Sequence, residues 1–217
     1  MSLPGGYLTF DDAVGLLKSG GVLLMGTDTL PGFHCRADLA APVARIQALK
    51  FREAGKSLLV LAGSPEQAGL ATGVLDARQA AYCRLCWPGP FSLILPAGAG
   101  LDPAVNAGGA TVAVRVPDLP SLRDLVLAVG FPLVSTSANL AGAAPSGDLE
   151  SARAAFGDRV DGVWAPSAAG SPSGGARSAV PSALIDVTVW PPVVLRPGPV
   201  EAPPADSGGL DGGSPGV

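Results

Sequence analysis

The stretch "PLVSTSANLAG" (residues 132–142) begins as an apolar strand and ends in three hydroxyl groups and an amide. Alternate residues of a strand share a face, so Ser135, Ser137 and Asn139 lie in a row on one side. Such polar groups are costly to bury without hydrogen-bond partners. A helix cap or a turn accounts for Asn139 but hardly for all three. In open α/β sheets, ligands collect outside the carboxyl ends of the strands, so we interpret this strand end as part of a ligand site.

Helical and strand-like segments alternate on both sides of this stretch. Capping residues and apolar spacing predict helices at 9–21, 42–53, 64–71, 76–86, 121–130 and 148–157. Short apolar runs predict strands at 21–27, 57–63, 91–97, 111–117, 132–139, 183–189 and 192–198. Because helices and strands mingle throughout, we expect an α/β domain with a mixed sheet.

We expect one domain over residues 1–200, followed by a disordered tail over 201–217. The tail, "EAPPADSGGLDGGSPGV", lacks apolar periodicity. Within the domain, residues 165–182 form a loop rich in Gly, Ser, Ala and Pro, which is long enough to suggest a functional role.

Composition and charge exclude several classes of function. The 217 residues are 47% apolar and 15% charged, with a formal net charge of -4, whereas a broad nucleic-acid surface is usually basic. The single histidine, His34, argues against a Ser-His-Asp catalytic triad. No apolar run approaches the roughly 18–20 residues that span a bilayer, and no signal sequence follows Met1. We therefore expect a cytoplasmic protein without a membrane partner.

The cysteines leave two interpretations open. Cys83 and Cys86 share a helix face and, with His34 and Cys35, offer four side chains of the kind that bind zinc. Buried, reduced thiols in a reducing compartment explain the same residues more simply. We prefer the second interpretation and predict no metal site.

A dense group of cations lies in "KFREAGKS" (residues 50–57). Gly55 and the strand that follows indicate that the preceding helix ends near Lys50. In extended chain, Lys50 and Arg52 share one side, where they would face one anion together. A solvated helix terminus is the alternative, although such a density of cations is unusual in so sparsely charged a chain.

Further polar residues interrupt apolar strands. Thr27 follows the strand at 21–27, and Arg115 lies inside "VAVRVP", where an inward-facing guanidinium needs an anionic partner. Ser182 and Arg196 have similar positions in "VPSALID" and "VVLRPG". Neither a P-loop nor a G-x-G-x-x-G motif is present, so side chains would have to hold any phosphate.

Seven ordered motifs together resemble the YrdC-like threonylcarbamoyl-AMP synthase family. They span residues 22–198 and read "TDTLPGF", "KFREAGK", "WPGPFSLIL", "TVAVRVP", "STSANLAG", "VPSALID" and "VLRPG". The resemblance implies a twisted, mostly parallel mixed sheet with flanking helices and a concave ligand face. It also implies synthesis of threonylcarbamoyl-adenylate from L-threonine, bicarbonate and ATP with Mg²⁺, with release of pyrophosphate. This is the first step of tRNA threonylcarbamoyladenosine formation.

The resemblance also assigns partners and site residues. It implies tRNA or double-stranded RNA, and downstream tRNA threonylcarbamoyl-transfer proteins, as partners. The residues that match the catalytic quartet around the ATP phosphates are Lys50, Arg52, Ser137 and Asn139. Lys56, Thr111 and Arg196 match further nucleotide contacts, and the threonine pocket is matched by Thr27, Arg115, Ser135 and Ser182.

Two departures from the family pattern bear on amino-acid selectivity. Pro31 replaces an aromatic residue of the first motif, and Leu61 stands where many members have histidine. An alternative therefore stays open, namely a non-catalytic RNA-binding paralogue of the same fold. The complete quartet favours the enzyme. A carbamoyltransferase module with related chemistry is less consistent with the chain, because no partner domain accompanies it.

Overall fold

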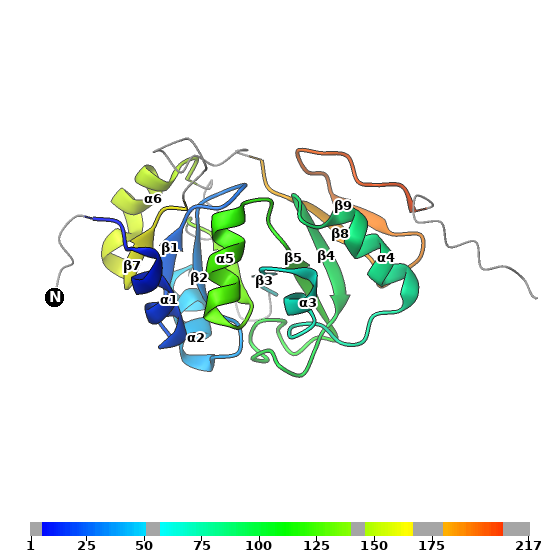
Figure 1. The fold of residues 1–217 in the computed structure, drawn as a ribbon, viewed down its shortest axis with the longest axis horizontal. Coiled ribbons are helices and arrows are strands. Elements are labelled where there is room, and N and C mark those ends of the chain that lie inside the picture. Colours follow the sequence, from blue (N-terminus) through cyan, green and yellow to red (C-terminus); the bar gives the residue numbers. More distant parts are fainter. Residues whose placement is uncertain (1–5, 51–56, 140–145, 167–179, 206–217) are drawn as a thin grey trace, which may run out of the picture.

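A nine-stranded mixed sheet runs the length of the computed structural model, which describes residues 6–50, 57–139, 146–166 and 180–205 (Figure 1). The strand order is β7-β1-β2-β6-β3-β5-β4-β8-β9. The strands are β1 (Leu23–Met25), β2 (Gly32–Arg36), β3 (Leu59–Leu61), β4 (Phe91–Pro96), β5 (Thr111–Arg115), β6 (Leu133–Ser137), β7 (Gly162–Trp164), β8 (Ala183–Asp186) and β9 (Val193–Arg196). The helices are α1 (Phe10–Lys18), α2 (Ala40–Leu49), α3 (Pro65–Ala68), α4 (Ala77–Cys86), α5 (Pro120–Val129), α6 (Leu149–Phe156) and the 3₁₀ turn η1 (Gly157–Arg159).

The α/β class, with a mixed sheet and flanking helices, is confirmed, but the strand directions differ from expectation. Parallel pairing joins β1 to β7, β3 to β5 and β4 to β8, whereas the other five pairs are antiparallel. The expected mostly parallel sheet is therefore corrected to one in which antiparallel pairs predominate. Short connections account for two of the antiparallel pairs, β1 with β2 and β8 with β9, because short loops join only antiparallel neighbours.

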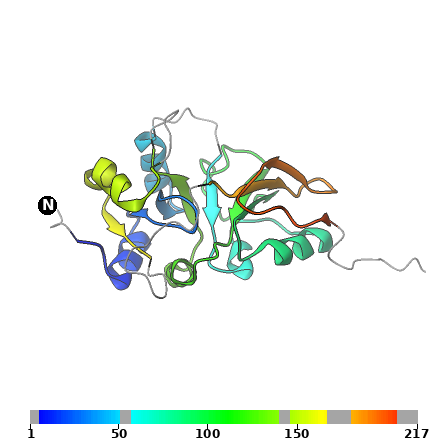
Figure 2. The same cartoon turned by 90° about the horizontal axis from the view of Figure 1, so that it is seen from above.

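Helices cover both faces of the sheet because neighbouring residues of a strand point to opposite sides. Leu23 and Met25 of β1 pack with α1 and α5 in one apolar cluster. Leu24, between them, belongs to a larger cluster that includes α2, α4 and α6. Figure 2 shows α1 and α5 on one side of this part of the sheet and α2 and α6 on the other.

Side chains cap the helices at the predicted residues. The Thr9 hydroxyl accepts a hydrogen bond from the Asp12 amide at 3.2 Å, and Ser64 caps α3 in the same way. Asp76 and Gln79 form a complete capping box at α4, in which each side chain accepts from the other residue's backbone amide. These bonds satisfy amides that have no partner within a helix, so they fix where each helix begins.

Contacts of the domain continue beyond residue 200, the predicted start of the tail. The Tyr82 hydroxyl donates to the Pro203 carbonyl at 2.8 Å, and Ala202 packs against the larger apolar cluster. Residues 206–217 of the predicted tail and 167–179 of the long loop lie outside the described residues. Within the part that is described, no helix is both long and apolar enough to cross a bilayer.

Two glycines give a test of the helix backbone, because neither has an atom within 4 Å of an added Cβ. Gly130 ends α5 with φ at 84°, where Gly130→Ala should destabilise the fold by about 1–2 kcal/mol. Gly15 is exposed inside α1, so Gly15→Ala should stabilise it by about 0.8–1 kcal/mol. Urea unfolding of both variants measures the effects, and changes of the same sign would contradict the assigned backbone conformations.

Candidate active site

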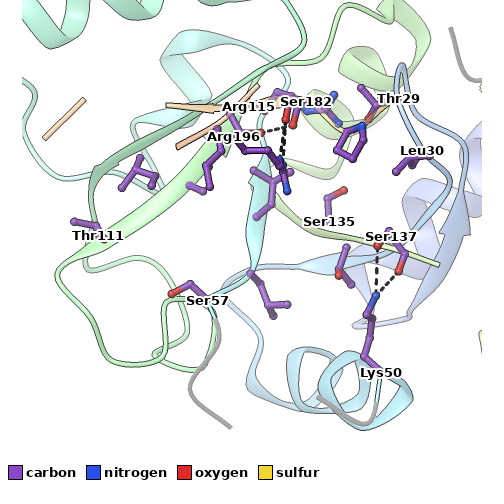
Figure 3. Close-up of a pocket in the computed structure, with 18 residues that line it drawn as sticks. Thr29, Leu30, Lys50, Ser57, Thr111, Arg115, Ser135, Ser137, Ser182 and Arg196 are labelled. Carbon is purple, nitrogen blue, oxygen red and sulfur yellow. Dashed lines mark hydrogen bonds between the residues drawn. The ribbon is translucent and has the colours of Figure 1, made fainter. Parts of the chain in front are cut away.

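One face of the central strands forms the floor of a cavity of about 530 Å³ (Figure 3). Leu59 of β3 pairs directly with Ala113 of β5 and with Ser135 of β6, so these three side chains share a face, and all three line the cavity. The next residues along two of these strands, Val60 and Val114, point to the opposite face and are fully buried in the core. The register of the sheet therefore decides which polar side chains reach the cavity.

Lys50 lies at one end of this cavity, where it meets the end of β6. It is the C-cap of α2, as predicted, and is only 6% exposed. Its ammonium donates to the Ser137 carbonyl at 2.6 Å and to the Asn139 side-chain oxygen at 2.7 Å. The Ser137 hydroxyl donates to the same Asn139 oxygen at 2.6 Å. The structure thus brings together three members of the predicted quartet, and these oxygens replace water that the buried ammonium has lost.

The other predicted cations of this segment, Arg52 and Lys56, lie outside the described residues. At the mouth of the cavity, Thr111 and Ser57 line the wall and are exposed.

Arg115 lines the cavity from the end of β5 and is only 2% exposed. One of its terminal nitrogens donates to Asp28 at 2.8 Å, and the second Asp28 oxygen accepts from the Asp118 amide at 3.2 Å. Burial lowers the pKa of Arg115, whereas the charge of Asp28 opposes this shift. The Arg115 Nε has no hydrogen-bond partner among the described residues. A guanidinium that lines the cavity and is held in place by Asp28 suits the carboxylate of a ligand.

The loop after β1 contributes different residues from those predicted. The Thr27 hydroxyl donates to the Leu30 carbonyl at 2.8 Å and accepts from the Thr29 amide at 3.1 Å. Thr29 and Leu30 line the cavity, whereas Thr27 is engaged inside the turn. Asp28 was not among the predicted site residues, although an acid directly after a buried strand and an arginine within a later apolar strand were the signals for this ion pair.

A pair of serines forms the opposite part of the wall. The Ser182 hydroxyl lies 2.8 Å from that of Ser92, which sequence reasoning missed, and both line the cavity. Arg196 is exposed and donates to the Ser182 carbonyl from two nitrogens, at 3.1 and 3.3 Å. Figure 3 shows Arg115, Ser182 and Arg196 together, away from Lys50 and Ser137.

His34 lies beside the floor of the cavity, outside its lining, rather than in a metal site. It is fully buried, and its Nε2 is 3.0 Å from the Ser135 hydroxyl. Burial is the main cause that lowers the pKa of His34 to about 3; the Gly32 carbonyl opposes the shift and the charge of Arg115 adds to it. His34 and Cys35 are consecutive in β2 and point to opposite faces, so they do not form the zinc site considered above.

The cysteines themselves are buried and unpaired. Cys35, Cys83 and Cys86 are all free thiols, and burial raises the pKa of each. Among the described residues, no group of three or more His, Cys, Asp or Glu side chains is arranged to hold a metal ion.

Both departures from the family pattern have structural roles. Pro31 is buried, and its carbonyl accepts from the Ala138 amide at 2.9 Å, which ties the loop to the end of β6. Leu61 belongs to the apolar cluster of α1 and α5 and pairs across the sheet with Arg115. Leu61 is therefore part of the apolar core and does not line the cavity.

Comparison with known proteins settles the family. Residues 15–198 match the Sua5/YciO/YrdC family model, described as "Telomere recombination". This chain belongs to that family. It is 40% identical over 149 residues to a threonylcarbamoyl-AMP synthase of Chromohalobacter salexigens, covering 69% of this chain and 80% of the relative. It is 36% identical over 144 residues to the protein of that name from Thiobacillus denitrificans, covering 66% and 77% of the two chains.

Solved structures of the family share the fold. P. abyssi Sua5 complexed with L-threonine superposes with a TM-score of 0.79 at 28% identity. The match covers 87% of this chain and 54% of the Sua5 chain, so this protein spans about half the length of that relative. E. coli YciO superposes with a TM-score of 0.75 at 24% identity, covering 88% and 90% of the two chains, which shows the common fold.

The buried ion pair gives a prediction about stability. Asp28→Asn leaves the Arg115 guanidinium buried without its counter-charge, so it should lower the free energy of unfolding by about 3 kcal/mol. The double variant Asp28→Asn/Arg115→Met removes the orphaned charge and should recover part of the loss. Asp38→Asn breaks the more exposed pair with Arg36 and should cost less than about 1 kcal/mol. Urea unfolding measures the free energies of unfolding. Equal losses for Asp28→Asn and Asp38→Asn would contradict the assigned burial of the Asp28 pair.

His34 gives a prediction about pH. Below about pH 6.5 the unfolded chain binds a proton at this ring, which the folded protein binds only near pH 3. The free energy of unfolding should therefore fall as the pH drops through this window. His34→Gln removes this contribution, so its stability should fall less than that of the wild type between pH 7 and pH 4. Thermal unfolding at a series of pH values measures the difference, and parallel profiles would contradict the assigned neutral ring.

Proposed function

We propose that this protein is a threonylcarbamoyl-AMP synthase, which joins L-threonine, bicarbonate and ATP and releases pyrophosphate. The observation that carries the proposal is the convergence of Lys50, Ser137 and Asn139 at one end of a cavity whose other wall holds Arg115. The name and sequence similarity of the curated relatives support the same function.

The Lys50 end suits the phosphates of ATP. Its ammonium is fixed by the end of β6, and the Ser137 hydroxyl lies beside it as a further polar group. Arg52 and Lys56, which follow Lys50 in the sequence, would add charge to this end. Thr111 and Arg196 are the remaining proposed nucleotide contacts, and both line the cavity. Fixed cations at this position would stabilise the negative charge of the triphosphate as it reacts.

The Arg115 wall suits the amino acid. The Arg115 guanidinium lines this wall as a donor group for a carboxylate, and the Ser135 and Ser182 hydroxyls offer hydrogen bonds to the polar groups of threonine. Thr27 was expected here, but its neighbour Thr29 lines the cavity. Threonine in the P. abyssi Sua5 complex supports an amino-acid site in this fold.

The chemistry requires one anion to approach another. The threonine amine and bicarbonate give a carbamate with loss of water, and a carbamate oxygen then forms a bond to the α-phosphorus of ATP. The bond from that phosphorus to the leaving pyrophosphate breaks. No carboxylate or imidazole is among the described lining residues, so this chain contributes charge and alignment to the reaction rather than a general base. Because that lining is also poor in the carboxylates that bind metals, Mg²⁺ would enter with ATP, held by its phosphates.

The net charge and the free thiols bear on the partners and the cellular location of the protein. A net charge of -4 favours local contact with tRNA or double-stranded RNA over a broad basic surface, and downstream tRNA threonylcarbamoyl-transfer proteins would receive the product. The three free cysteines support a cytoplasmic location, where thiols stay reduced.

Mass spectrometry of threonylcarbamoyl-adenylate tests the proposal directly. The wild type should form product only with ATP, bicarbonate and threonine together. Lys50→Met should lower the rate about 100-fold or more, because a fixed charge at the phosphates is lost. Lys18→Met removes an exposed cation from the last turn of α1 and should keep the activity. Lack of a threonine-dependent product from the wild type would disprove the proposed function.

A further inference from the structure

The placement of His34 on β2 is set by the sheet register. Its backbone pairs with Ser135 of β6, and directly opposite side chains in an antiparallel pair lie close together. The imidazole Nε2 accordingly lies 3.0 Å from the Ser135 hydroxyl. Ser135 lines the cavity, whereas His34 is fully buried and does not belong to the lining. The ring can therefore influence a ligand only through Ser135.

We propose that His34 is a positioning residue for the amino-acid end of the site, whose ring holds the Ser135 hydroxyl in one orientation toward bound threonine. The identity of threonine rests on the proposed function, whereas the coupling of ring, hydroxyl and cavity rests on the geometry. The proposal assigns a role in substrate binding to the single histidine of the chain.

The surroundings of the ring restrict its movement. A methyl group at Gly32 would lie 3.2 Å from the His34 Cε1 and 2.6 Å from the Thr136 carbonyl, so the ring lies against the glycine with little spare space. Leu23, which pairs with His34 on its other side, is also fully buried. A confined ring keeps its hydrogen-bond partner at a fixed position, which a flexible side chain does not.

The neutral state of the ring suits this role. Burial lowers the pKa of His34 to about 3, so the ring carries no charge near neutral pH. A serine hydroxyl has one donor and two acceptor positions, and the imidazole takes one of these. The remaining positions then have defined directions, so the hydroxyl offers the cavity a fixed pattern of hydrogen bonds instead of a freely rotating one. A charged ring would instead add a cation beside a cavity that Lys50 and Arg115 already line.

The single histidine allows a direct test that does not depend on catalysis. Selective ¹⁵N-histidine labelling gives NMR signals from one ring only. We expect the shifts of a neutral ring at pH 7, a change in the Nε2 signal when L-threonine is added, and no such change in Ser135→Ala. The proposal would be overturned if L-threonine leaves the Nε2 shift of the wild type unchanged, or if it changes that shift equally in Ser135→Ala.

Substitutions at His34 give a second test through the KM values for threonine and for ATP. The amide of His34→Gln reaches about where Nε2 lies, whereas that of His34→Asn reaches only about as far as Nδ1. His34→Asn and the apolar His34→Leu should raise the threonine KM about tenfold, the effect of losing one neutral hydrogen bond, with little change in the ATP KM. His34→Gln should restore most of the loss. The proposal would be overturned if His34→Gln and His34→Asn change the threonine KM equally, or if the KM values for threonine and for ATP rise together.

The two tests separate this inference from the proposed function. A wild type that forms no adenylate disproves the function, and the NMR experiment then still decides whether His34 and Ser135 respond to an amino acid. An active wild type whose threonine KM is unchanged in His34→Leu disproves the role of His34 alone. Thermal unfolding of each variant at pH 7 identifies any that fail to fold. If a His34 variant does not fold, the NMR experiment on the wild type and on Ser135→Ala still tests the proposal.

Discussion

The contact of the Lys50 ammonium with the end of β6 is the interaction on which the site depends. Lys50 ends α2, and Ser137 and Asn139 end β6, so one buried charge joins two segments that lie 87 residues apart in sequence. An ammonium that is only 6% exposed needs oxygens in place of water, and the Ser137 carbonyl and the Asn139 amide supply them. The same contact therefore fixes where the helix ends, how the chain leaves the strand and where a cation meets the cavity.

The register of β6 is the second constraint. This strand pairs antiparallel with β2 on one side and β3 on the other, and Ser135 faces the cavity while Val134 is buried in the core. A shift of one residue would place the valine in the cavity and the serine in the core, so the apolar core strongly favours the observed pairing. Folding of the core and assembly of the site are for this reason one process, because the pairing that buries Val134 in the core also directs Ser135 to the cavity.

Features that depend on local chemistry were predicted from the sequence, and features that depend on pairing were not. The end of α2 at Lys50 and the polar row on β6 follow from glycine placement and strand alternation. Strand β2 was missed, because "GFHCR" lacks the repeated β-branched pattern of a strand and forms one through its place between β1 and β6. The three-residue β7 was missed for a similar reason, since it is too short to show a period.

The same distinction explains the errors within the site. The sequence identified "TDT" as polar, but only the turn geometry decides that Thr27 bonds within its loop while Thr29 reaches the cavity. The partnership of Asp28 with Arg115 joins residues 87 apart and has no local pattern. The sequence analysis considered His34 only as the single histidine and as a possible zinc ligand, because its pairing with Ser135 appears only once the strands are aligned.

The two buried cations face ligands in different ways, which gives the cavity a direction. The Asp28 carboxylate neutralises Arg115, so this residue offers a ligand directed hydrogen bonds more than net charge. Lys50 donates hydrogen bonds to the Ser137 carbonyl and to the Asn139 side-chain oxygen. A lysine ammonium binds phosphate as a compact point charge, whereas a single carboxylate is selected by the planar geometry of a guanidinium. This difference is consistent with the proposed placement of the phosphates at the Lys50 end and of the amino acid beside Arg115, on either side of the floor that carries Ser135.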